Sequence, residues 1–83
     1  MLRPRTGADH HAAAADHYES AAACQRRASS FYLDRDFVAA AREGVRAHIH
    51  MSEAVHHSNE ATKYDLEHQI ALATERASIA AEE

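Results

Sequence analysis

The chain has 83 residues and a formal net charge of −4, and eight of its residues are histidine. This length allows one domain. The nine Lys and Arg residues are scattered, which argues against nucleic-acid binding, and no apolar run is long enough to cross a membrane. The N-terminus lacks the apolar core of a signal peptide, and the single cysteine, Cys24, rules out an intrachain disulfide. We therefore expect a cytoplasmic protein without nucleic-acid or membrane partners.

Alanine dominates the apolar composition, and large apolar side chains are scarce. Leu, Ile, Val and Phe together make up about one residue in seven. Alanine favours helix more strongly than any other residue, but it buries little area. The composition therefore predicts an all-α chain with a poor core, which a homodimer, a bound metal ion or both would stabilise.

The first helix is predicted to begin after a short N-terminal arm. Residues 1–6 contain a proline and are expected to form a disordered arm. Thr6 followed by Asp9 is similar to a capping box, with Asp in place of the usual Glu. The helix is then expected to run from Gly7 to Ser30 without an internal Gly or Pro.

The segment after this helix contains the strongest signal for a turn. Residues 29–34 interrupt the helical pattern, and Asp34 is a good N-cap for a second helix. Leu33 and Val38 would flank this cap as a hydrophobic staple. The simplest interpretation is one helix of about 45 residues, roughly 70 Å long, from Asp34 to the C-terminus.

A rival interpretation breaks the second helix near Ser58–Asn59, or between Thr62 and Asp65, which would form another capping box. An ordinary apolar stripe follows this region: Leu66, Ile70, Ala73, Ala77 and Ala80. We therefore expect residues 7–64 to form a His- and Ala-rich hairpin, and residues 65–83 to be a C-terminal helical extension used for packing or dimerisation. The expected fold is all-α, a long antiparallel helical hairpin that dimerises into a four-helix bundle.

Histidine recurs at seven-residue intervals in both predicted helices. His10 and His17 belong to one stripe and His50 and His57 to the other, and alanines lie between them. This spacing is typical of residues that face a partner helix. We call these four residues the histidine seam. A buried imidazole must be hydrogen-bonded or coordinated, so the seam predicts either a polar network or a metal site.

A turn near Asp34 brings the two stripes into register. His17 then lies level with His50, and His10 lies level with His57, with an alanine layer between the two pairs. The pairs would be roughly 10.5 Å apart along the helix, which is too far for one ion to be bound by both. We therefore expect one site at His17 and His50, and a second site formed or supported by the other pair.

The candidate metal ligands are the seam and one neighbouring carboxylate: His10, His17, His50, Glu53 and His57. Glu53 shares one side of the second helix with His50 and His57, because the three are spaced i, i+3 and i+7. A His-dominated site suits Zn, Fe, Cu or Ni, and this ligand set does not distinguish them. Such a site would serve metal storage, sensing or redox chemistry, and hydrolysis is a further alternative. Ligation of haem by two histidines is a less favoured variant.

Two other interpretations of the seam stay open. It would also suit a structural or interaction module whose histidines form a hydrogen-bonded, pH-responsive network, or acid–base catalysis without a metal. The remaining histidines are expected on the flanks of the helices: His11, His48, His56 and His68. Cys24, level with Glu43, is expected to fill the core, and no residue is assigned a catalytic role.

Three sequence patterns resemble small His- and Ala-rich helical proteins of bacteria. They are residues 15–22 (A-D-H-Y-E-S-A-A), residues 47–50 (A-H-I-H), and the segment in which His56-His57 precedes Glu60-Ala61 and Lys63. The resemblance spans about residues 8–68 and implies a helical hairpin with no established activity. The chain departs from that pattern at Tyr18, Cys24 and Phe31, where His is usual, which argues against storage of several ions.

A second resemblance is to encapsulated-ferritin-type half-bundles, which dimerise to complete a metal site. It rests on Glu53-x-x-His56 and on the length of the hairpin. A di-iron site needs about four carboxylates. The acidic residues of the first predicted helix lie off its histidine stripe, so a di-iron oxidase is not expected.

Overall fold

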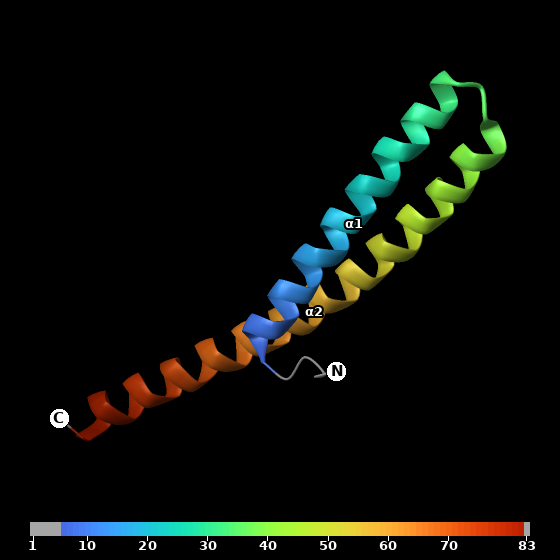
Figure 1. The fold of residues 1–83 in the computed structure, drawn as a ribbon. Helices are drawn as coiled ribbons and strands as arrows, with labels where there is room; N and C mark the ends of the chain where they lie inside the picture. Colours follow the sequence, from blue (N-terminus) through green and yellow to red (C-terminus); the bar gives the residue numbers. More distant parts are fainter. Residues whose placement is uncertain (1–5, 83) are drawn as a thin grey trace.

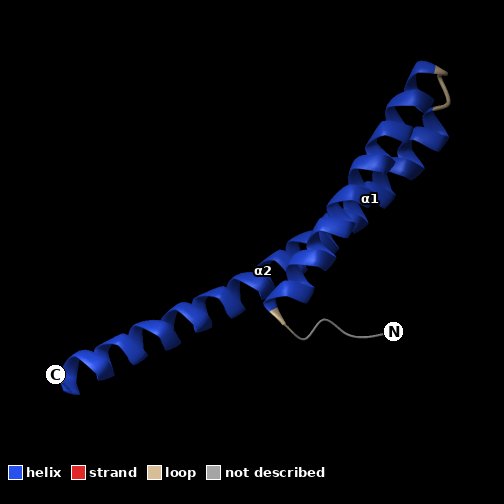
Figure 2. Cartoon of the chain, turned by 60° about the vertical axis from the view of Figure 1, so that its left-hand side comes forward, coloured by secondary structure: helices blue, strands red, loops and turns tan. Residues whose placement is uncertain are grey.

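The computed structural model describes residues 6–82 as two α-helices joined by a tight turn. Helix α1 spans Gly7–Leu33 and helix α2 spans Phe37–Glu82. The helices run antiparallel and side by side, and α2 continues well past the start of α1 (Figure 1). The described residues contain no strand and measure 71 × 26 × 12 Å along their principal axes (Figure 2). The predicted all-α antiparallel hairpin is confirmed.

Thr6 caps the N-terminus of α1, as the sequence predicts. Its backbone is extended, and its Oγ1 accepts a hydrogen bond from the N–H of Asp9 at 3.1 Å. Such a cap satisfies one of the unpaired N–H groups of the first turn, a contribution of about 1 kcal/mol. Apart from Thr6, the predicted N-terminal arm (residues 1–6) lies outside the described residues.

α1 ends in a Schellman motif. The N–H of Arg35 donates to the carbonyl of Tyr32 at 3.0 Å, and the N–H of Asp36 donates to the carbonyl of Phe31 at 2.8 Å. Arg35 has a φ of 59°, the left-handed conformation that usually requires glycine. These bonds carry α1 to Leu33, three residues beyond its predicted end.

Asp36, and not Asp34, caps the N-terminus of α2. The Oδ1 of Asp36 accepts a hydrogen bond from the N–H three residues further on, at 3.1 Å. Asp34 closes the C-terminus of α1 instead. The predicted staple does not form, since Leu33 is 84% exposed and Val38 is 72% exposed. The predicted cap was wrong because the Schellman motif uses two further residues to end α1 before α2 begins.

α2 is one continuous helix of 46 residues, so the rival interpretation with a break was wrong. The Thr62 hydroxyl donates to the carbonyl of Ser58 at 3.0 Å, a bond made inside a helix rather than at its start. The boundary between residues 7–64 and 65–83 stays a prediction, and α2 passes through it without interruption.

The contact between the helices is built from small side chains. The buried apolar residues of the described part are Cys24 and seven alanines, and within each helix these alanines recur every seven residues. They are Ala14, Ala21 and Ala28 on α1, and Ala40, Ala47, Ala54 and Ala61 on α2. The helices approach so closely that a Cβ added to Gly7 would lie 3.2 Å from the Cβ of Tyr64. The predicted poor core is confirmed, and polar residues fill the gaps between the alanines.

Candidate metal centre

The histidine seam pairs across the helices in the predicted register. The Nδ1 atoms of His10 and His57 lie 3.0 Å apart, and those of His17 and His50 lie 3.3 Å apart. His10 is buried, and the other three histidines are half-buried. Each pair is close enough for one ring to donate to the other.

The two pairs are not separate, contrary to the prediction. The rings of His17 and His57 stack with their centroids 5.7 Å apart and their planes inclined by 7°. Side chains on a helix lean towards its N-terminus. Because the helices are antiparallel, His17 and His57 lean towards each other across the alanine layer. The expectation that donor atoms from the two pairs could not approach one ion was therefore wrong.

His17, Glu53 and His57 form the candidate metal centre. One potential ligand atom from each residue lies within 4.8 Å of the other two. α1 provides His17, and α2 provides the other two residues from consecutive turns. Glu53 is exposed and the two histidines are half-buried, so the centre opens to solvent at its carboxylate.

Three of the five predicted ligands thus come together in one cluster, and the other two do not join it. His10 and His50 lie instead behind the cluster histidines, each against one Nδ1 atom. Two imidazole nitrogens and one carboxylate oxygen form a donor set used by zinc enzymes and by non-haem iron enzymes.

The surroundings of His57 favour its neutral form. Burial lowers its pKa below the ordinary value of 6.5, and so do the neighbouring His10, His56 and His17 when they are charged. The Glu53 carboxylate opposes this shift, but it does not reverse it. A metal ligand must present a neutral imidazole, so this environment suits coordination.

Tyr64 closes one end of the seam and was not among the predicted site residues. Its ring lies 5.7 Å from the ring of His10. In the sequence, the only indication that Tyr64 lies on the same stripe is its spacing of seven residues from His57. On the opposite flank of the pair, the ring of the exposed His56 meets that of His57 edge-on at 5.3 Å.

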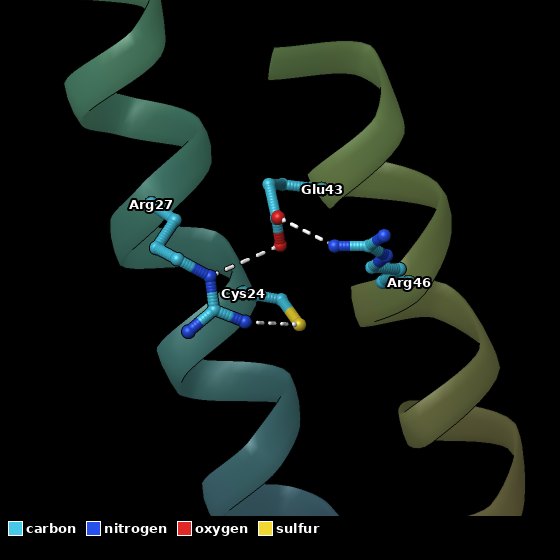
Figure 3. A network of polar contacts seen from close by, with 4 residues as sticks. All are labelled: Cys24, Arg27, Glu43 and Arg46. Carbon is cyan, nitrogen blue, oxygen red and sulfur yellow. Dashed lines mark hydrogen bonds and ion pairs between the residues drawn. The ribbon is translucent and has the colours of Figure 1, made fainter. Parts of the chain in front are cut away.

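A second polar cluster lies nearer the turn, where Cys24 and Glu43 face each other as predicted (Figure 3). The Glu43 carboxylate accepts from Arg27 Nε at 3.2 Å and from Arg46 Nη1 at 2.9 Å. Arg27 Nη2 also lies 3.2 Å from the Cys24 sulfur. Neither arginine was predicted from the sequence to contact Glu43. Their only signal was a position three residues after Cys24 and Glu43, one turn along each helix.

The Glu43 carboxylate stays ionised although its side chain is buried. Burial raises its pKa, but the hydrogen bond and charge of Arg27, together with the charge of Arg46, hold the pKa below its ordinary value. The two arginines are largely exposed and satisfy both carboxylate oxygens. This cluster is therefore a fully paired ion network that accounts for a buried charge.

The predicted flanking histidines lie outside the seam. His11 contacts Asp65 at 3.2 Å on the surface, and His48 and His68 are exposed. None of the described helices is both long and apolar enough to span a membrane.

No protein-family model, curated protein or solved structure matches this chain.

Proposed function

We propose that the protein binds a transition-metal ion between α1 and α2, with His17, Glu53 and His57 as ligands. The observation that supports this most strongly is that potential donor atoms of all three lie within 4.8 Å of one another. The residues come from both helices, so a bound ion would crosslink a hairpin whose apolar core is mostly alanine. Metal binding would then add the stability that the small core does not provide.

The cluster needs little rearrangement to accept an ion. Donor atoms bound to one tetrahedral ion at about 2.0–2.2 Å lie roughly 3.3–3.6 Å apart. Closing from 4.8 Å to this spacing requires a shift of at most about 1.5 Å. Glu53 is exposed and has three rotatable side-chain bonds, so its carboxylate can make this movement without moving the helices.

The donor set suits Zn, Fe, Cu or Ni more than Ca or Mg, because two of its three ligands are imidazoles. Three protein ligands leave a coordination position for water, which is compatible with sensing, redox use or hydrolysis.

Haem fits this site less well than a metal ion. Two axial imidazoles need about 4 Å between their nitrogens, with the porphyrin between the rings, whereas the paired Nδ1 atoms lie 3.0 and 3.3 Å apart.

Calorimetric titration of tag-free protein with zinc chloride tests the proposal. We expect one saturable site per chain. His57→Ala should weaken binding by more than the roughly 10–100-fold that loss of a supporting group costs. His68→Ala is the matched control, because His68 is exposed on the projecting part of α2. Absence of binding by the wild-type chain, or equal losses in the two variants, would overturn the proposal.

A second candidate function is a metal-free structural or interaction module with a polar, pH-responsive seam. One specific observation favours it: no buried side-chain nitrogen or oxygen atom lacks a hydrogen-bond partner within the described range. The two His–His contacts would satisfy the Nδ1 atoms of the seam without a metal. In this case the melting temperature would be unchanged by chelator, whereas a metal-dependent hairpin would melt at a lower temperature once stripped.

We also propose that two hairpins associate into a four-helix bundle. Several large apolar side chains of α2 are exposed, among them Leu66 (53%) and Ile70 (66%). These two lie beyond the end of α1, on the part of α2 that projects alone (Figure 1). A second copy is the partner that would cover this apolar stripe and extend the small core.

A further inference from the structure

We propose that His10 and His50 are positioning residues, which fix the ring orientation and proton location of the ligands His57 and His17. This inference rests on the proposed metal site. Each cluster histidine has its Nδ1 within 3.0 or 3.3 Å of the Nδ1 of its neighbour. No hydrogen bond involves the Nε2 of His17 or His57 among the described residues. Nε2 is therefore the nitrogen that each ligand has free for an ion.

Each Nδ1–Nδ1 contact needs one donor and one acceptor, and coordination through Nε2 decides which histidine donates. In a pair of neutral imidazoles one Nδ1 must donate and the other must accept, because two lone pairs or two N–H groups facing each other would repel. A neutral histidine that binds a metal through Nε2 has its proton on Nδ1. The N–H at Nδ1 of His17 then donates to Nδ1 of His50, which has its own proton on Nε2. The His57–His10 pair repeats this arrangement.

The alternative is that an ion sits directly between two paired Nδ1 atoms. The His17–His50 distance of 3.3 Å would permit this. However, His50 is not part of the three-donor cluster, so an ion at this pair would lose the Glu53 carboxylate and the second layer. The cluster favours coordination through His17 and His57, with His50 and His10 behind them. Metal-ligating histidines ordinarily donate their second N–H to a carboxylate, a backbone carbonyl or water, which fixes the tautomer. Here the Nδ1 of His50 or His10 would be the acceptor.

Burial and packing also suit His10 to a supporting role. It is 8% exposed and is the only buried histidine among the described residues. Its ring is held between His57 and Tyr64, at centroid distances of 5.3 and 5.7 Å. A ring packed in this way is well placed to orient its partner.

Asparagine and alanine variants of His50 separate the two roles. The Asn side chain places its amide near the position of a histidine Nδ1, so it can still accept from His17, whereas Ala cannot. We expect His50→Ala to weaken zinc binding about 10–100-fold, and His50→Asn to restore an affinity close to that of the wild-type protein. His10→Ala and His10→Asn should behave in the same way. If His50→Asn binds zinc as weakly as His17→Ala does, His50 is itself a ligand and the inference is wrong.

Nitrogen NMR of the metal-free protein gives a second test that does not depend on metal affinity. At a pH of about 8, well above the ordinary histidine pKa, we expect one histidine of each pair to have its proton on Nδ1 and its partner to have its proton on Nε2. Two histidines of one pair with the same tautomer would overturn the inference even if zinc binds. If the wild-type chain binds no metal but shows the expected tautomers, the proposed function fails while the positioning geometry stands.

Discussion

The rings of His17 and His57 stack at 5.7 Å, although the two residues belong to different layers of the hairpin. This contact turns two isolated His–His pairs into one continuous row of four imidazoles, in which His10 contacts His57, His57 stacks on His17, and His17 contacts His50. It also brings ligand atoms from both helices near Glu53. The candidate centre therefore depends on the lean of the side chains as much as on the register of the helices.

Arg35, in the turn, has a backbone conformation that is unfavourable for any residue with a side chain. Arg35 has a φ of 59°, where a side chain costs roughly 1–2 kcal/mol and glycine has no such cost. We expect Arg35→Gly to stabilise the hairpin by about 1 kcal/mol, measured from urea unfolding curves. The matched control is Arg42→Gly, an exposed position inside α2, which should destabilise by about 1 kcal/mol. A loss of stability in Arg35→Gly would show that the left-handed turn is not formed in solution.

The metal-free protein should lose stability as the pH falls below about 6.5. The pKa of His57 is lowered in the folded chain by burial and by the histidines that face it from both helices, His10, His17 and His56, against the opposing charge of Glu53. Below the unfolded pKa, the unfolded chain therefore binds more protons than the folded chain. The contribution of His57 is fully present above this pH and is lost as the pH falls through its folded pKa.

Melting temperatures between pH 8 and pH 5, in the presence of chelator, measure this effect. The Glu43 pKa is also lowered in the folded chain. The stability that Glu43 contributes is lost only at a more acidic pH, below the ordinary glutamate pKa of 4.5. His57→Leu should flatten the profile, and the exposed His68→Ala should leave it unchanged. A wild-type melting temperature that is constant or rises towards pH 5 would mean that His57 is not held neutral in the folded chain.

The seven-residue spacing predicted much of this structure, because two antiparallel helices joined by a short turn have one register. It correctly placed His17 opposite His50, and Cys24 opposite Glu43. Spacing alone did not place His17 against His57, since it fixes only the level of each Cα, whereas the general lean of helical side chains towards the N-terminus closes the gap between the two layers. The turn was misjudged for another reason. A Schellman motif is ordinarily recognised by its glycine, and here the left-handed residue is Arg35.

The arginines around Glu43 show a further limit of sequence reasoning. Arg27 and Arg46 look like ordinary solvated charges, and both are in fact largely exposed. Only the burial of Glu43 between the helices gives them a specific partner, and that burial is a property of the packed hairpin.

We expect the protein to sediment at micromolar concentration as a dimer of twice the 9.2 kDa chain mass. Ile70→Glu should shift it towards monomer, because it places a charge on the apolar stripe of the projecting helix. Leu33→Glu is the control, since Leu33 is 84% exposed at the turn, far from that stripe. A compact and stable wild-type monomer would contradict the predicted four-helix bundle.

A crystal structure of the zinc-loaded protein, with the ion located by anomalous scattering, tests the central claim most directly. We predict one ion between the helices, at about 2.0–2.2 Å from a nitrogen of His17 and a nitrogen of His57, with the Glu53 carboxylate as third ligand. Two results would contradict it. One is an ion bound only by surface histidines such as His48 or His68. The other is a well-ordered histidine seam that contains no ion at saturating zinc.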